Sequence, residues 1–533
     1  MSIRKIRQYQ QECVASCDAL PAGGRGQVIL PTGSGKTIIG EEVIKNTARR
    51  GDTTVSTVFV PRLLLGKQWI HRSATSLIKQ SGLPFAFVNI NSGGLSNSVK
   101  KMIEQAQFKI TGPGVPAIKT TTSPEELSKE VKSLKKKGFH VIALSTYHSS
   151  GVLKESGVRS DLALYDECQF LVSASSEETT FTDSLDINAD RRIFMTATPS
   201  YTDSADGRGM HNVSKFGNVL FQRSPKHIIE AGAIVGPKIH LIGSEGIIES
   251  RDYNSRADMI VQAWQRHKEQ VKKNSIDPDQ IGGKLLVVCD GQMTLEGIMS
   301  CRRFREIREE RPDLKFYALS SDYGIYIDGD YRQKVNNSDK ERLLEALYSL
   351  ATNDDAIILH HDMIAEGLDV PGITGVIPLR NCRRSKFLQN LGRSARLHPE
   401  DARRIFETGE LEPCDYANYI KPNCYVILPY LIENRDDFLV RNGTIIDELR
   451  SEYGFDPSEN IICDFLNPAQ QGPVFPEDLI EREIRGTTDS LRAYYHKIEN
   501  EAVEVEEFIA ASKVRRFTKE QLKQFITAMA RNQ

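Results

Sequence analysis

The sequence lacks the cysteine pattern of a zinc ribbon or of a disulfide-stapled domain. Its nine cysteines are scattered over 533 residues, and no Cys-x-x-Cys pair occurs. We therefore expect free, buried thiols in a reducing compartment. No run approaches about eighteen apolar residues, which argues against a transmembrane helix and a membrane partner. The basic start, residues 1–7, lacks the apolar segment of a secretory signal, so the cytoplasm is the expected location.

The sequence also lacks a net charge that would attract nucleic acid to the whole surface. Its 69 basic and 71 acidic side chains give a formal net charge of -2. Any nucleic-acid site must therefore be a local groove. The length allows about three or four domains, each large enough to bury its own core.

Apolar runs alternate with helical patterns in two successive series. The strands predicted in the first series are Val28–Leu30, Val55–Val60, Phe85–Val88, His140–Leu144, Leu162–Tyr165 and Arg192–Met195. Those predicted in the second series are Lys238–Ile242, Lys284–Cys289, Lys315–Leu319, Ala356–Leu359, Gly375–Pro378 and Tyr425–Pro429. Strands that alternate with helices predict parallel sheets flanked by helices, so the fold class is α/β.

We predict three parts: residues 1–235, residues 236–440 and a mainly helical C-terminal extension over residues 441–533. Within the second part, residues 323–337 are predicted to form a long loop. The extension ends in a segment rich in lysine and arginine. A solvated helix face is a better interpretation of this segment than a nucleic-acid contact.

A glycine-rich loop follows the first predicted strand and precedes a helical pattern. It comprises Pro31, Thr32, Gly33, Ser34, Gly35, Lys36 and Thr37. Gly33 and Gly35 allow backbone N–H groups to converge on an anion at the positive end of the helix. Lys36 can reach the β- and γ-phosphates, and the Thr37 hydroxyl can ligate Mg²⁺. The flanking strand and helix favour a nucleotide site over an ordinary glycine turn with a solvated lysine.

Two further strand ends carry polar residues suited to nucleotide hydrolysis. Asp166 would hold Mg²⁺, directly or through water, and the adjacent Glu167 can polarise an attacking water. Acidic pairs also end many ordinary strands, but their place after a phosphate-binding loop favours a catalytic pair. Thr196 and Thr198 follow at the end of the next strand, where their hydroxyls can respond to the presence of a γ-phosphate.

A pair of arginines in the second series completes the pattern. Arg393 and Arg396 are three residues apart, so both point to one face of a helix. Two guanidinium groups that reach a γ-phosphate from another domain would stabilise charge in the transition state. A surface helix with spare arginines is the alternative, and the Gly-Leu-Asp stretch at residues 367–369 makes it less favourable.

The ordered set of motifs resembles that of superfamily 2 helicases and translocases over about residues 4–400. The matching stretches are Arg7–Gln10, Pro31–Thr37, Val60–Leu63, Ser145–Tyr147, Asp166–Gln169, Thr196–Pro199, Glu366–Pro371 and Gln389–Arg396. Within the superfamily, the chain resembles the DNA-acting branch that holds the restriction-enzyme motor subunits, including the type III kind, and the phage UvsW helicase.

The resemblance implies two tandem RecA-like domains with ATP and Mg²⁺ in the cleft between them. The implied catalytic residues are Lys36, Asp166, Glu167, Gln389, Arg393 and Arg396. The implied nucleotide-binding residues are Arg7, Gln10, Pro31, Thr32, Gly33, Ser34, Gly35, Lys36, Thr37, Gly367 and Asp369. In this scheme Thr37 and Asp166 hold the metal, and Gln10 reads adenine.

The resemblance also implies how hydrolysis is coupled to a nucleic-acid strand. The implied coupling residues are Gln169, Thr196 and Thr198. The residues placed where such enzymes contact phosphates are Pro61, Arg62, Thr121, Thr122, Thr146 and Tyr147. Closing and opening of the cleft would move the domains along one strand, and phosphate-directed contacts make such movement independent of base sequence.

Two positions depart from the family pattern. Leu30 stands where the phosphate-binding loop usually opens with glycine, and Gln169 stands where this branch more often has histidine. Glutamine donates and accepts hydrogen bonds, for instance with Gln389, but it cannot titrate. The departure therefore bears on the coupling and leaves the hydrolytic residues in place.

The leading hypothesis is an ATP-dependent DNA helicase or translocase that acts on single-stranded or branched DNA. One alternative is the ATPase motor subunit of a restriction or other defence complex. A second alternative is an NTP-switched clamp that remodels a nucleoprotein without processive movement. An RNA helicase is less favoured, although the phosphate-contacting motifs do not distinguish a 2′-hydroxyl.

Overall fold

The structure is a computed structural model. The described residues are 6–61, 65–66, 69–70, 73, 75–91, 116, 118–173, 183–201, 209–244, 252–289, 291–319, 325–327, 330–332, 337–361, 370–379, 384–431, 445, 449–450, 452–454 and 460–465. The predicted site residues Arg62, Gly367 and Asp369 lie outside these ranges, as does most of the predicted C-terminal extension.

The first half of the chain forms an eight-stranded sheet in which each described pairing is parallel. The strand order is β4-β3-β5-β2-β6-β7-β1-β8. The strands are β1 (Arg25–Ile29), β2 (Val55–Val60), β3 (Phe85–Ile90), β4 (Lys119–Thr121), β5 (His140–Thr146), β6 (Leu162–Asp166), β7 (Arg192–Thr196) and β8 (Asn218–Gln222).

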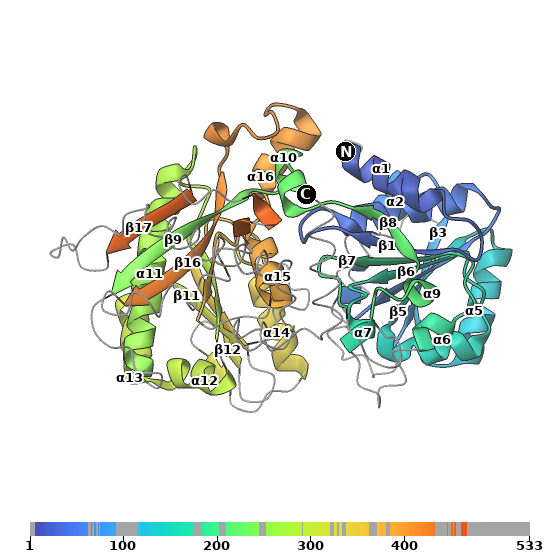
Figure 1. Ribbon diagram of the computed structural model, residues 1–533. Helices are drawn as coiled ribbons and strands as arrows, with labels where there is room; N and C mark the ends of the chain where they lie inside the picture. Colours follow the sequence, from blue (N-terminus) through green and yellow to red (C-terminus); the bar gives the residue numbers. More distant parts are fainter. Residues whose placement is uncertain are drawn as a thin grey trace, which may run out of the picture.

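Helices cover both faces of this sheet (Figure 1). The main helices are α1 (Gln8–Asp18), α2 (Lys36–Arg49), α5 (Pro124–Lys136), α6 (Ser150–Ser156), α7 (Phe170–Ser173), α9 (Val213–Phe216) and α10 (Pro225–Glu230). A π-helical turn, η1 (Thr75–Gln80), and two 3-10 turns, η2 (Tyr147–Ser149) and η3 (Asp183–Asp186), connect other elements. One apolar core packs α1 and α2 against the sheet, and a second packs α5 and α6 against its other face.

The second half forms a nine-stranded sheet of order β13-β12-β11-β14-β10-β15-β16-β9-β17. It is parallel except at β11–β12 and β12–β13. The strands are β9 (Gly236–Ser244), β10 (Lys284–Val288), β11 (Lys315–Leu319), β12 (Ile325–Ile327), β13 (Asp330–Arg332), β14 (Ala356–His360), β15 (Gly375–Pro378), β16 (Asn423–Leu431) and β17 (Ile461–Phe465).

Helices again lie on both faces of the second sheet. They are α11 (Tyr253–Asn274), α12 (Gln292–Ser300), α13 (Arg302–Glu310), α14 (Asn337–Tyr348), α15 (Arg384–Ser394) and α16 (Pro399–Arg403), with the turns η5 (Arg404–Thr408) and η6 (Tyr416–Asn418). Alternate residues of β10 enter different cores: Leu285 and Val287 face α11, whereas Leu286 and Val288 face α14. This alternation is the pattern expected of a strand buried on both faces.

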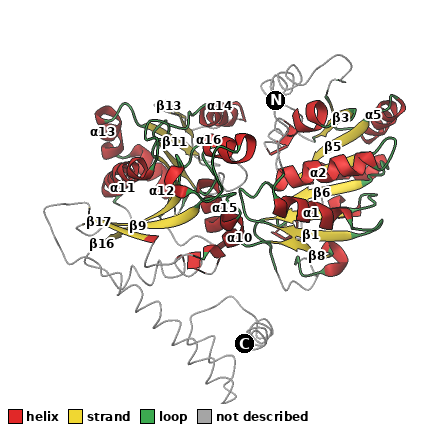
Figure 2. Ribbon diagram, turned by 90° about the horizontal axis from the view of Figure 1, so that it is seen from above, coloured by secondary structure: helices red, strands yellow, loops and turns green. Residues whose placement is uncertain are grey.

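The two sheets lie side by side, with α15 and α10 between them (Figures 1 and 2). The core under α1 and α2 continues through Ala233, Ile234 and Val235 to Leu391 and Ala395 of the α15 region. In the first sheet, β6, β7 and β1 are neighbours, and parallel strands place their carboxyl ends at one edge. The loop after β1, Asp166 at the end of β6 and Thr196 at the end of β7 therefore share that edge.

The predicted α/β class, with two parallel sheets flanked by helices, is confirmed. The twelve predicted strands are present, with shifts of a few residues at their ends. The structure adds β17 to the second sheet, within a region for which we predicted mainly helix. The prediction of a long loop over residues 323–337 was wrong, because β12 and β13 pair there as an antiparallel hairpin.

Among the described residues, no helix combines the length and the apolar character needed to cross a membrane.

Candidate functional site

The glycine-rich loop has the backbone conformation that a phosphate cradle requires. Gly33 and Gly35 have φ angles of 88° and 86°, in the left-handed region that favours glycine. Helix α2 begins directly afterwards at Lys36, so its positive end faces the loop. The Lys36 ammonium is buried and donates to the carbonyls of Leu30 at 3.1 Å and Pro31 at 3.5 Å. The lysine is thus held within the loop.

The N-terminal segment is tied to the loop through the carbonyl of Ser34. The Tyr9 hydroxyl donates to this carbonyl at 2.6 Å, and the Gln10 side-chain amide donates to it at 2.9 Å. The amide oxygen of Gln10 accepts the backbone N–H of Arg7 at 3.1 Å. The Arg7 guanidinium lies 3.8 Å from the ring centroid of Phe406, which belongs to the second half of the chain. Gln10 therefore supports the loop, while Arg7 bridges toward the second sheet.

The acidic pair stands at the end of β6 in a strained turn. Glu167 has a φ of 50°, which non-glycine residues rarely adopt, and its N–H donates to Asp166 Oδ1 at 3.1 Å. Burial, with a further contribution from the Glu167 carboxylate, raises the pKa of Asp166 to about 7, although the Lys36 ammonium opposes this rise. A cation bound at this carboxyl group would compensate the cost of its burial.

A chain of hydrogen bonds leads from Glu167 to the second half of the protein. Gln169 Nε2 donates to Glu167 Oε2 at 2.9 Å, and its Oε1 accepts the Thr196 hydroxyl at 2.6 Å. Thr196 Oγ1 accepts the N–H of Thr198 at 3.0 Å. Gln389 Nε2, on α15, then donates to Thr198 Oγ1 at 3.4 Å. The structure thus connects Gln169 to Gln389 through the two threonines.

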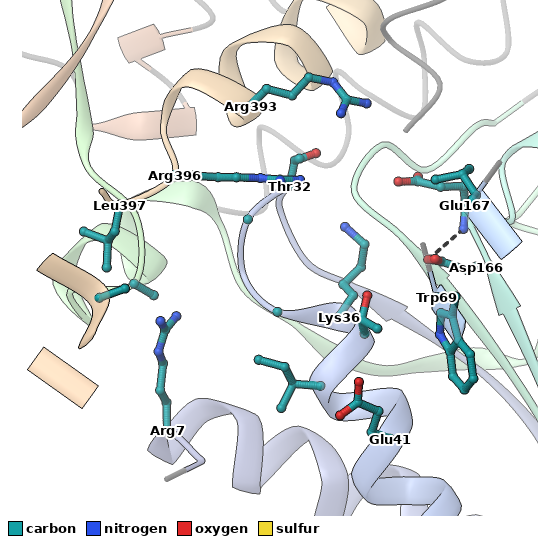
Figure 3. A pocket seen from close by; sticks show the side chains of 17 residues that line it. Arg7, Thr32, Lys36, Glu41, Trp69, Asp166, Glu167, Arg393, Arg396 and Leu397 are labelled. Carbon is teal, nitrogen blue, oxygen red and sulfur yellow. Dashed lines mark hydrogen bonds between the residues drawn. The ribbon is translucent and has the colours of Figure 1, made fainter. Parts of the chain in front are cut away.

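The arginine pair reaches the loop from α15. Arg393 is in the last turn of this helix, and Arg396 follows its end (Figure 3). A Cβ built on Gly392 would lie 2.5 Å from Thr32 Cβ, and one built on Gly33 would lie 3.4 Å from Arg396 Cγ. The two segments therefore approach so closely that Gly392 has no room for a side chain.

The phosphate-binding loop, the acidic pair and the arginine pair surround one cavity of about 490 Å³, a volume in the range of small-molecule sites. The residues lining it are Arg7, Thr32, Gly33, Gly35, Lys36, Thr37, Ile38, Glu41, Leu65, Trp69, Asp166, Glu167, Ala233, Arg393, Arg396, Leu397 and Ala402. Figure 3 shows Arg393 and Arg396 across the cavity from Lys36, with Asp166 and Glu167 to one side. The Thr37 hydroxyl and the Asp166 carboxylate are oxygen groups of the kind that Mg²⁺ prefers as ligands.

Several lining residues were missed by the sequence reasoning. Glu41 is buried beside the cavity, four residues after Thr37 on α2. That spacing places both side chains on one helix face and was an available signal. Trp69, Leu397 and Ala402 had no comparable signal, because only the fold brings them to the loop.

Arg62 aside, the residues predicted to contact a nucleic-acid strand lie at the other half of the same sheet edge. Pro61 follows β2, Thr121 ends β4 and Thr146 ends β5, with Thr122 exposed just beyond β4. Thr121 Oγ1 donates to Glu126 Oε2 at 2.8 Å, and Thr146 Oγ1 donates to Ser149 Oγ at 3.0 Å.

The Tyr147 side chain is fully buried and is used within the fold. Its hydroxyl donates to the carbonyl of Asp166 at 2.8 Å, and its ring stacks on Phe59 with centroids 6.1 Å apart. The side chain thus supports the strand that carries the acidic pair.

Comparison with known proteins places this site in a family context. Residues 3–201 match the family described as "Type III restriction enzyme, res subunit". No curated protein matches the chain in sequence.

Among solved structures, the ATP-dependent type ISP restriction-modification enzyme LlaBIII bound to DNA is 16% identical, with a TM-score of 0.61. The match covers 98% of this chain and 36% of that one. The related enzyme LlaGI, in complex with a DNA substrate mimic, is 15% identical over 95% of this chain and 34% of its own, with a TM-score of 0.51. The chain therefore spans about a third of the length of either enzyme.

A further similar structure is Mss116p bound to single-stranded RNA and AMP-PNP. It is 13% identical, with a TM-score of 0.50, and the match covers 93% of this chain and 82% of that one. At these identities the likenesses establish the fold alone. Residues 3–201 are thus similar to the family of type III restriction enzyme res subunits, and the chain shares the tandem RecA-like fold of these solved structures.

Proposed function

We propose that this protein is an ATP-dependent DNA helicase or translocase that couples hydrolysis to movement along DNA or to its remodelling. The observation that carries the proposal is the convergence of Lys36, Asp166 and Glu167 from one RecA-like domain with Arg393 and Arg396 from the other. An ATP site divided between two domains forms and breaks as they move, which is what a motor requires. We place the division between the domains at residues 235 and 236, with the extension from residue 441.

The lining residues fit ATP and Mg²⁺. Thr37 and Asp166 would hold the metal, and the bound metal would neutralise charge on the β- and γ-phosphates. Lys36 would exchange its bonds to the loop carbonyls for bonds to these phosphates. Glu167 would orient the attacking water and accept its proton. Arg393 and Arg396 would stabilise the charge that develops as the γ-phosphoryl group is transferred.

The remaining predicted nucleotide contacts differ in how the structure supports them. Arg7 lines the cavity and would contact the nucleotide directly. Gln10 uses both ends of its amide on the protein, so its main role would be to hold the loop in place for adenine binding. Gly367 and Asp369, which lie outside the described residues, keep their proposed place near the ribose.

The hydrogen-bond chain through Gln169, Thr196 and Thr198 supplies a route for coupling. It begins at Glu167, which would orient the attacking water, and ends at Gln389 in the second domain. A change at the γ-phosphate would alter the first bond, and separation of the domains would break the last. Hydrolysis and domain movement would thus be linked through polar contacts.

DNA is the proposed track because the matching family and the two restriction enzymes point to it. Pro61, Arg62, Thr121, Thr122, Thr146 and Tyr147 are the proposed strand contacts. The restriction-family match also supports the alternative of a motor subunit within a larger defence complex. The likeness to an RNA-bound protein keeps an RNA helicase as an outcome of the test.

The decisive experiment measures ATP hydrolysis and strand displacement by the full chain. We expect hydrolysis to rise on addition of single-stranded or forked DNA, and Lys36→Ala to remove it. Displacement of a DNA fork but not of a matched RNA fork would support a DNA helicase. Stimulated hydrolysis without displacement would point to a translocase or a clamp. Hydrolysis that is equal with and without any nucleic acid would contradict the motor.

A further inference from the structure

A lysine that the sequence motifs do not include is buried directly behind the arginine pair. Lys421 precedes β16 and is 2% exposed. Its ammonium donates to the backbone carbonyls of Ser394 and Arg396, the latter at 2.6 Å. These carbonyls belong to the segment that carries Arg393 and Arg396.

The same segment is tied to Lys421 a second time, through the main chain. The Asp401 carboxylate is fully buried and accepts the N–H groups of Ile420 and Lys421, each at 2.9 Å. Asp401 belongs to α16, which follows the arginine pair directly. The segment from residue 394 to residue 401 therefore accepts four hydrogen bonds from residues 420–421, two from the Lys421 ammonium and two from main-chain N–H groups.

The opposite side of the arginine segment is held by the connection between the domains. The N–H of Val235 donates to the carbonyl of Ala395 at 2.8 Å, and Ile234 pairs with Arg396 in an antiparallel bridge. A Cβ on Gly33 would lie 3.1 Å from Ile234 Cγ2, so this connection also contacts the phosphate-binding loop. Three successive carbonyls, those of residues 394, 395 and 396, thus have fixed donors.

Burying the Lys421 ammonium carries a cost in solvation free energy. Burial lowers the pKa of Lys421 to about 8, which shows that the charged form is disfavoured in this environment. The negative end of the α15 dipole and two carbonyls compensate only part of that cost. An apolar side chain would avoid the cost, but it would leave the carbonyls of Ser394 and Arg396 without this donor.

We propose that Lys421 is a positioning residue for ATP hydrolysis, which fixes the backbone that presents Arg393 and Arg396 to the nucleotide. The inference rests on the proposed ATP hydrolysis. Lys421 touches neither the cavity nor the nucleotide, so it acts through the arginines. Its loss lowers kcat and leaves the affinity for ATP almost unchanged, because the phosphate-binding loop belongs to the other domain.

The first test compares Lys421→Met with wild type by steady-state hydrolysis and by binding of a fluorescent ATP analogue. We expect kcat to fall about 10- to 100-fold, as expected for a displaced catalytic group. The dissociation constant should change less than about threefold. Lys421→Arg, which keeps a charged donor, should recover part of kcat. The control Tyr425→Phe removes one hydrogen bond to Asn274 from the adjoining strand and should leave kcat unchanged.

A double-mutant cycle separates positioning from a general structural role. If Lys421 acts through the arginines, Lys421→Met should cost much less in an Arg396→Ala background than in wild type. Two losses that multiply in full would overturn the proposal, as would an unchanged kcat. If Lys421→Met does not fold, Asp401→Asn provides the same comparison, and an unchanged kcat in that variant would also overturn it.

A measurement without hydrolysis keeps this inference distinct from the proposed function. Amide hydrogen exchange over residues 390–400 should be faster in Lys421→Met than in wild type, in the absence of nucleotide. Unchanged exchange there would contradict the positioning role even in an active enzyme. Conversely, wild-type protein without nucleic-acid-stimulated hydrolysis would refute the motor, while the exchange result would still decide whether Lys421 holds the segment.

Discussion

The contact between Gly392 and Thr32 provides the sharpest test of whether the two domains close as the structure shows. Gly392 is in α15, where alanine would strengthen an isolated helix by about 1 kcal/mol. In the structure, however, the added Cβ would lie 2.5 Å from Thr32 Cβ and 3.3 Å from Thr32 Oγ1. Gly392→Ala should therefore stabilise helix α15 within the second domain, and it should oppose docking of that domain on the phosphate-binding loop.

The size of the effect follows from the cost of overpacking, which is about 1 to 3 kcal/mol for one added methyl group. Thr32 and Gly392 belong to different domains, so this strain is relieved when the domains separate. The docked arrangement would then be disfavoured about 5- to 150-fold, since 1.4 kcal/mol corresponds to a factor of ten. If hydrolysis requires docking, kcat should fall within that range.

The assay is steady-state ATP hydrolysis with saturating DNA, together with thermal unfolding. The matched control is Gly291→Ala, because Gly291 belongs to the same domain and a Cβ there meets nothing within 4 Å. We expect a loss of kcat in Gly392→Ala alone, without a lower unfolding temperature. Normal hydrolysis would refute the idea that this contact forms in the active state. A lower unfolding temperature would show a folding defect in place of a docking defect.

Four further predictions follow from the same site. Lys36→Ala should abolish hydrolysis, whereas Glu167→Gln should abolish it and still bind a fluorescent ATP analogue, because the proposed role of the carboxylate is to act on water and not on the phosphates. Arg396→Ala should lower kcat by about 10³-fold or more with little change in nucleotide affinity, as expected for loss of an arginine finger. Gln389→Ala should reduce strand displacement more than hydrolysis, since it removes the end of the hydrogen-bond chain; equal losses would contradict a coupling role. Burial lowers the pKa of Lys421 from about 10.5 to about 8. Between these pH values the unfolded chain binds the lysine proton and the folded chain does not, so the stability of wild type relative to Lys421→Met should rise from pH 8 to pH 10.5, by up to about 1.4 kcal/mol per pH unit. Denaturation midpoints of the two proteins measure this difference.

The parts of the site that could be predicted depend on short stretches of sequence. The loop around Lys36 carries its own glycines, and a buried strand before Asp166 places the acidic pair at an edge. Because the parallel strands β1, β6 and β7 are neighbours, these local signals are brought together by the fold class alone. Knowledge of the detailed packing was not needed to predict which side chains would meet.

The parts that were missed depend on docking or on pairing between distant residues. The run Ile461–Phe465 is apolar at four of its five positions, which is only a weak strand signal in so short a run, and it forms β17 by pairing with β9. The hairpin of β12 and β13 did carry a signal, since Asp328-Gly329 is a preferred pair for two-residue hairpin connections. Glu41, by contrast, needed only the helix period after Thr37 to be identified.

The contacts around the cavity suggest which parts move together. Lys421 and Asp401 bind the arginine segment firmly to the second domain, through charged groups bonded to backbone atoms. Besides the apolar and main-chain contacts of residues 233–235, the contacts that cross between the domains include the ring contact of Arg7 with Phe406 and the 3.4 Å bond from Gln389 to Thr198. Single contacts of this kind contribute about 1 kcal/mol each. We therefore expect the arginines to move with the second domain as one body, and nucleotide binding to shift the balance between its docked and undocked positions.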